Sequence, residues 1–212
     1  MTKKQALKIC GGLSAPSKMP CKSYSIPVRF CKVGLKLQSI EKSTCFACYA
    51  DRGCYNFKST QNAMLRRYKS LKNNRWVDAI VFLISAQRKK DFFRWHDSGD
   101  IQGIFHLENI CEVARRLPLT SFWLPTREYG MIRDYKKMGG VIPENLTIRL
   151  SSYFVDAPLP LAVMRELECV GSGVTTTQKE ERICPAPHQD GKCGSCRACW
   201  DKNVEGVFYV KH

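Results

Sequence analysis

The stretch DFFRWHDSGD (residues 91–100) is a short apolar run that ends in polar residues. Similar runs follow at TSFWLPT (120–126), NLTIRLSSYF (145–154) and ECVGSGVTTT (168–177). Patterns typical of amphipathic helices lie between them, such as the apolar positions within residues 104–117. This alternation predicts parallel βα units. Four or five such strands are too few for a closed eight-stranded barrel, so we predict an α/β fold with a partial (βα) barrel or a small, mostly parallel sheet.

Two cysteine-rich segments flank this core. We expect residues 1–57 to form an irregular segment packed on the core, residues 58–180 to form the βα core, and residues 181–212 to form a C-terminal cluster segment, all in one globular domain. The longest wholly apolar run, residues 79–84, is six residues long and too short to span a membrane. The first residues also lack an apolar stretch of signal-peptide length, so we expect a cytoplasmic protein.

Twelve cysteines are the compositional feature that most needs an explanation. A reducing cytosol makes structural disulfides rare, and a chain of this size can build a core without them, so metal ligation is favoured. The strongest pattern is Cys184, Cys193, Cys196 and Cys199, spaced C-x8-C-x2-C-x2-C. Closely spaced thiolates suit a 4Fe-4S cluster, whereas four-cysteine zinc sites more often use two separated C-x2-C pairs. The spacing therefore favours an iron–sulfur cluster, with zinc as the alternative.

A second constellation centres on Cys45 and Cys48, with Cys31 upstream and Cys54 downstream. The C-x2-C pair is typical of a metal-binding knuckle, and Cys31, Cys54 or both could add ligands. A thioredoxin-type dithiol is the alternative, but that motif normally follows a strand, and no strand-like run precedes this pair. Cys111 and Cys169 fit small buried hydrophobes. Cys10 and Cys21 are left without an assigned role.

Polar side chains gather where the predicted strands end. In parallel βα architectures the carboxyl ends of the strands build the functional site. Asp97 and Asp100 follow the first run and Arg127 follows the second, so we predict a mouth for a polar or anionic ligand with these three as candidate catalytic residues. The structural alternative is that an aspartate caps a helix and Arg127 pairs with it. We expect Arg149 to line the same mouth and His96 to be a hydrogen-bonded structural histidine.

Lysine and arginine exceed aspartate and glutamate by 34 to 19, which gives a net charge of +15. Such a charge attracts nucleic acid or another polyanion at long range, and a solvated surface is the equally supported alternative. The basic residues concentrate on or beside predicted helices, at Arg66, Arg67, Lys69, Lys72, Arg88, Lys89, Lys90, Arg115, Arg116, Lys136 and Lys137.

Five stretches carry a family resemblance: SKMPCKSYSIPVRFCKVG (17–34), CFACYA (45–50), RWHDSGD (94–100), LPTRE (124–128) and CPAPHQDGKCGSCRACW (184–200). In this order they resemble the uncharacterised phage proteins of the gene-product-eighty-eight family, over residues 17–212. The resemblance implies a cytoplasmic location in an infected host cell and brings no assigned reaction. It also implies seven cluster ligands, namely Cys31, Cys45, Cys48, Cys184, Cys193, Cys196 and Cys199.

The element that contains Cys45 and Cys48 also resembles the end of the C-x3-C-x2-C loop of radical S-adenosylmethionine enzymes, which use a partial or full βα barrel. The first cysteine of that loop would fall at Glu41. A cluster held by Cys31, Cys45 and Cys48 alone would leave one iron open toward the mouth, for a small anion rather than S-adenosylmethionine.

Two hypotheses follow from the sequence. The first is a phage-type protein with one or two 4Fe-4S clusters and a radical-enzyme-like βα core, acting in redox chemistry or in cluster-dependent ligand binding. The second is a zinc-stabilised, non-catalytic protein that binds nucleic acid through its basic helices. Whether the protein is an enzyme is left open by both.

Overall fold

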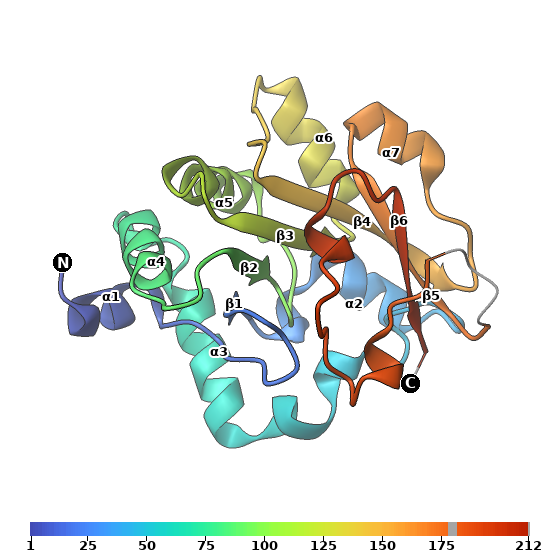
Figure 1. Ribbon diagram of the computed structural model, residues 1–212, viewed down its shortest axis with the longest axis horizontal. Coiled ribbons are helices and arrows are strands. Elements are labelled where there is room, and N and C mark those ends of the chain that lie inside the picture. The colour runs from blue at the N-terminus through green and yellow to red at the C-terminus, as the bar shows by residue number, and fades with distance from the viewer. Residues whose placement is uncertain (178–181, 212) are drawn as a thin grey trace.

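The computed structural model describes residues 1–177 and 182–211 and contains one sheet of six strands (Figure 1). Every neighbouring pair is parallel, and the strands lie side by side in chain order, so β1 and β6 form two open edges. This sheet confirms the predicted α/β fold and its partial, unclosed βα arrangement. The strands are β1 Ser23–Tyr24, β2 Phe92–Trp95, β3 Ser121–Thr126, β4 Leu146–Val155, β5 Val170–Thr175 and β6 Gly206–Val210.

The helices α4, α5, α6 and α7 pack in sequence along one face of the sheet (Figure 1). Apolar side chains from alternate strand positions, such as Phe93, Phe122 and Ile148, bury themselves against these helices and form the main core. No helix in the described part of the chain is long and apolar enough to cross a membrane. The helices are α1 Lys3–Cys10, α2 Lys32–Gln38, α3 Lys58–Ser70, α4 Trp76–Ser85, α5 Ile104–Arg116, α6 Tyr129–Lys137 and α7 Leu161–Leu167.

The opposite face of the sheet, here called the inner face, carries Arg94, Trp123 and Arg149. The C-terminal segment, residues 182–204, crosses this face before the chain returns as β6 (Figure 1). Trp200 from this segment packs on Trp123 in a second, smaller core, and its indole Nε1 donates to the carbonyl of Phe93 at 2.9 Å. The C-terminal segment is therefore part of the fold and not a loose tail.

The first 57 residues contain more regular structure than the sequence predicts. Thr2 and Gln5 form a capping box that starts α1, and Gly11 ends it in the left-handed conformation. Strand β1 extends the sheet beyond β2, and the fully buried Tyr24 of β1 accepts a hydrogen bond from the Trp76 indole at 2.9 Å. The prediction that this segment is irregular is therefore wrong for α1 and β1. The predicted boundary at 180 and 181 lies outside the described residues.

Candidate functional site

The Asp100 carboxylate is occupied by hydrogen bonds within the protein and does not face a ligand at the predicted mouth. It is 6% exposed, and its carboxylate accepts hydrogen bonds from the amide of Ile101 at 2.8 Å, the hydroxyl of Thr126 at 2.6 Å and the amide of Arg127 at 2.9 Å. Burial raises the pKa of Asp100 to about 6, although these hydrogen bonds oppose the shift. The carboxylate therefore ties the end of β2 to the end of β3.

Asp97 is likewise buried and engaged by other side chains. Its carboxylate accepts hydrogen bonds from the Ser23 hydroxyl and, at 3.2 Å, from the Tyr55 hydroxyl. Its backbone carbonyl accepts one from the Tyr49 hydroxyl at 2.5 Å. Asp97 thus fastens the turn that follows the cysteine pair Cys45 and Cys48 to the sheet.

Arg127, unlike Asp97 and Asp100, has side-chain atoms that are not engaged by other described residues. Its Nε donates to the Thr44 hydroxyl at 3.0 Å, and no ion pair in the described ranges involves it, Asp97 or Asp100. The structural alternative is therefore wrong in both parts: Arg127 reaches Asp100 through its backbone amide and not through an ion pair, and Gly103 rather than an aspartate occupies the N-cap of α5. The terminal nitrogens of the guanidinium make no protein hydrogen bond among the residues that the structure describes.

Glu128, the next residue, anchors Cys31, the first of the predicted ligand cysteines. Its carboxylate accepts hydrogen bonds from the amides of Lys32 at 3.0 Å and Val33 at 2.9 Å, in the first turn of α2. Cys31 is the N-cap of that helix, so the bonds fix Cys31 near the end of β3. This role of Glu128 could not be predicted from the sequence, because it depends on a contact with Lys32, 96 residues away in the chain.

Cys31, Cys45 and Cys48, here called the N-terminal cysteine group, meet at this mouth. The Sγ atoms of Cys31 and Cys45 both lie within 4 Å of the point that a Cβ on Gly34 would occupy, so a side chain there would intrude on both sulfurs. Burial raises the pKa of Cys31, and the charges of Asp100, Cys48 and Cys45 raise it further. The structure therefore brings the three predicted ligands together, and the possible fourth, Cys54, is exposed on the neighbouring turn.

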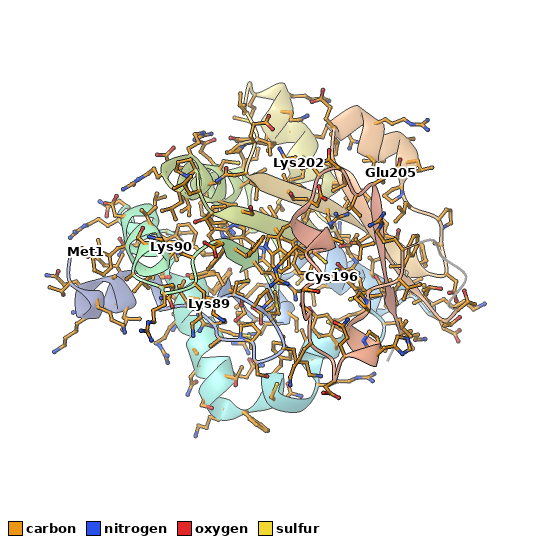
Figure 2. The ribbon with its side chains drawn as sticks, in the orientation of Figure 1. Met1, Lys89, Lys90, Cys196, Lys202 and Glu205 are labelled. Atoms are coloured by element: carbon orange, nitrogen blue, oxygen red, sulfur yellow. The ribbon has the colours of Figure 1, made fainter. Side chains whose placement is uncertain are left out.

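Cys184, Cys193, Cys196 and Cys199, here called the C-terminal cysteine group, gather on the inner face. Burial raises the pKa of Cys193, and the nearby thiols of Cys184 and Cys196 contribute to the rise. The Cys199 Sγ lies 3.3 Å from the hydroxyl of Tyr209 in β6. Cys196 lies near the middle of the view in Figure 2, well away from Met1 and the labelled lysines of residues 89 and 90.

The other cysteines divide as follows. Cys111 is fully buried in the main core and Cys169 packs against it, as predicted for small hydrophobes. Cys10, unassigned from the sequence, is also in the main core. Cys21 lies in the smaller core with Cys199, and burial raises its pKa to about 12 with a smaller contribution from Cys193. Cys21 is thus a neighbour of the C-terminal cysteine group.

Arg149 holds the C-terminal cysteine group against the sheet. The sequence placed it at the ligand mouth, but the structure buries it completely under the C-terminal segment, because its side chain points to the inner face. Its guanidinium donates to five backbone carbonyls at 2.5 to 3.0 Å, those of Gly171, Ala198, Cys199, Asp201 and Val204. The prediction that Arg149 lines the ligand mouth is therefore wrong, and its role is structural.

His96 is buried without the hydrogen bonds expected from the sequence. It is 2% exposed, and neither ring nitrogen has a partner among residues 1–177 and 182–211. Its backbone has a φ of 54°, unusual for a residue with a side chain, and its ring lies 5.3 Å from that of His106. Burial lowers the pKa of His96 well below its ordinary value, so the ring is neutral.

The cysteine arrangement can be compared with the needs of a metal. Among the described residues, no three Cys, His, Asp or Glu side chains are arranged to hold a single metal ion. Around one zinc ion, a Zn–S bond of about 2.3 Å places the sulfurs only about 3.8 Å apart. The thiolates of a 4Fe-4S cluster each bind a different iron, so they lie farther apart. All twelve cysteines are free thiols, so each group keeps thiols that a cluster could use.

Four of the eleven basic residues expected to contact polyanions are engaged within the protein. Arg67 is buried and donates to the Gly12 carbonyl, while Arg115, Arg116 and Lys136 form ion pairs with nearby carboxylates. These contacts reduce the positive charge that the helices present to a partner.

Comparisons with known proteins identify one family. A family model described as Gene product 88 matches residues 1–202. No curated protein and no solved structure matches the chain. The comparisons give no support to a relationship with radical S-adenosylmethionine enzymes.

Proposed function

The chain belongs to the phage gene product 88 family, and we propose that this member is an iron–sulfur protein with two 4Fe-4S clusters. The observation that carries the proposal is the gathering of seven free cysteines, from segments far apart in the sequence, into two groups. Such a cluster transfers single electrons when bound, and the proposed activity is redox chemistry or cluster-dependent ligand binding. Radical chemistry on S-adenosylmethionine is not part of this proposal.

The N-terminal cysteine group is the candidate for ligand binding. Three thiolates would leave one iron of a 4Fe-4S cluster open, and the exposed Cys54 is not needed for that set. Because Asp97 and Asp100 are occupied by internal hydrogen bonds, they shape the mouth. Arg127 would receive the ligand through its unbonded terminal nitrogens, which favours a small anion such as a carboxylate.

The C-terminal cysteine group is the candidate for a closed, electron-transferring cluster. Its four thiolates would complete the coordination of all four irons. The segment that carries them is fixed on the inner face by Arg149 and Trp200. A rigid, half-buried setting limits rearrangement of the ligands when the cluster changes its charge.

Elemental analysis tests this proposal. Protein purified without oxygen should be brown and contain iron and acid-labile sulfide in equal amounts, about eight of each per chain for two clusters. Colourless protein that contains zinc and no sulfide would contradict the proposal and support the zinc alternative.

The second candidate function, nucleic-acid binding by a zinc-stabilised chain, is favoured by one feature of the surface. Lys22, Arg88 and Lys89 line the same shallow pocket beside the loop that leads to Cys21. Binding through such residues should weaken steeply with salt and show little sequence preference. A gel-shift series with duplex and single-stranded DNA tests it, and the absence of any shift at low salt would remove this candidate.

A further inference from the structure

Arg94 of β2 lies between the two cysteine groups. Its Nη2 donates to the hydroxyl of Tyr49 at 3.2 Å, and Tyr49 directly follows Cys48 of the N-terminal cysteine group. Its guanidinium lies over the Trp123 ring, 4.3 Å from the ring centre, and its Nη1 lies 3.4 Å from the Met19 sulfur. These contacts hold the side chain along the inner face, under the C-terminal segment.

Two N–H donors at this place have no partner within the part of the chain that the structure describes. The Nε of Arg94 and the indole Nε1 of Trp123 are both buried, and neither makes a hydrogen bond among the described residues. Trp123 is only 4% exposed, so bulk solvent does not reach its indole. Arg94 and Trp123 are paired in the parallel register of β2 and β3, which sets the two residues side by side. A buried donor without an acceptor is costly, so a pair of them suggests an acceptor that the protein chain does not supply.

Cysteine sulfurs are among the groups packed around Trp123. Cys199 and Cys21 pack in the same small core as Trp123. Burial raises the pKa of Cys199 to about 11, and the positive charge of Arg94 acts in the opposite direction on it, as it does on Cys21 and Cys193. Arg94 therefore lies close to three thiols, and the proposed C-terminal cluster would sit within its reach.

Building on the proposed function, we infer that Arg94 and Trp123 are positioning residues for the C-terminal cluster and donate N–H hydrogen bonds to its sulfur atoms. Hydrogen bonds to cluster sulfurs and nearby positive charge both favour the reduced, more negative form. The two residues thus raise the reduction potential of the C-terminal cluster. Tyr49 fixes the other end of the guanidinium, so that Nε keeps its orientation.

The test is a redox titration of the cluster-loaded protein, followed by electron paramagnetic resonance. The variants are Trp123→Phe, which keeps an aromatic ring and removes the donor, Arg94→Met, which removes charge and donors, and Arg94→Lys, which keeps the charge alone. We expect the midpoint potential of the C-terminal cluster to become more negative in all three, most in Arg94→Met, with partial rescue in Arg94→Lys. Arg115→Met, on α5 at the opposite face, is the matched control and should leave the potential unchanged.

Two failures can be told apart. Full iron and sulfide content in Trp123→Phe and Arg94→Lys with wild-type potentials would overturn this inference and leave the proposed function standing. A wild-type protein without iron and sulfide would overturn the proposed function, and this inference with it. If Arg94→Met cannot retain the cluster, Trp123→Phe still decides, because removal of one indole N–H leaves all cysteines and arginines in place.

Discussion

In the N-terminal cysteine group the carboxylates of Asp100 and Glu128 act on Cys31 and Arg127 acts on Cys48, whereas the C-terminal cysteine group lies among arginines. After burial, the largest influence on the Cys31 thiol is the negative charge of Asp100, and Glu128 acts in the same direction. At the C-terminal cysteine group the corresponding influences on Cys199 include Arg149 and Arg94, which act in the opposite direction. Negative surroundings disfavour the reduced form of a cluster and positive surroundings favour it. Two clusters in one small fold would therefore differ in reduction potential, the C-terminal one being higher.

The largest expected effect comes from separating the two groups by mutation. Cys45→Ser should remove the N-terminal cluster and Cys196→Ser the C-terminal cluster, each lowering iron and sulfide content by about half, because each cluster needs its own thiolates. Cys111→Ser, in the main core, is the control and should keep full metal content. Iron and sulfide assays on anaerobically purified variants measure this. Equal metal loss in all three would show that the ligands are misassigned.

A second effect concerns how the C-terminal cysteine group is held. Arg149→Met leaves five backbone carbonyls without their donor, so we expect a loss of more than about 3 kcal/mol in the free energy of unfolding. Arg116→Met breaks only an exposed ion pair with Asp78 and should cost about 1 kcal/mol or less. Denaturant unfolding and protease cleavage within residues 182–204 provide the readouts. Similar stability of the two variants would mean that Arg149 does not fasten this segment.

A third effect should be confined to the mouth beside the N-terminal cysteine group. Burial raises the pKa of Asp100 to about 6 in the folded protein, above its ordinary value of 3.8. The folded state then binds the proton more tightly, so the contribution of this shift to stability is fully present below about pH 4 and is lost as the pH rises through 6.

The stability of wild type relative to Asp100→Asn should therefore fall between pH 4 and pH 7, since the variant cannot titrate at this position. Urea unfolding of both proteins across this range measures the difference. A difference that does not change with pH would contradict a raised pKa.

The smallest expected effect is a spectroscopic one at the open iron. Citrate should change the paramagnetic signal of the reduced N-terminal cluster, because a three-thiolate site can accept a carboxylate oxygen. Arg127→Met should weaken this response several-fold, and Cys54→Ala should leave it intact. If citrate changes the signal neither in wild type nor in Cys54→Ala, the N-terminal site is closed. The two cysteine groups would then have the same kind of coordination.

The elements that follow a regular local pattern could be predicted from the sequence. Strands β2 to β5 and the helices between them followed from alternating apolar patterns. Strand β1 was missed because it has only two residues and depends on pairing with β2. The helices α1 and α2 were missed because they have eight and seven residues, too short for a clear periodic pattern.

The roles of individual side chains were harder to predict. Arg149 was placed at the mouth because it lies near the end of a strand, but its acceptors come from carbonyls 22 to 55 residues further along the chain. His96 was expected to have a hydrogen-bond partner, and only the packed core shows that it has none in the described ranges. Such roles depend on long-range contacts, which spacing and periodicity do not encode.

The contrast between the two groups is tested most directly by a redox titration of the wild-type protein, followed by electron paramagnetic resonance and repeated with Cys45→Ser and Cys196→Ser. We predict two reduction steps in wild type, with the step at higher potential absent from Cys196→Ser and the step at lower potential absent from Cys45→Ser. A single step, or loss of the higher step in Cys45→Ser, would contradict the assignment of two clusters in opposite electrostatic surroundings.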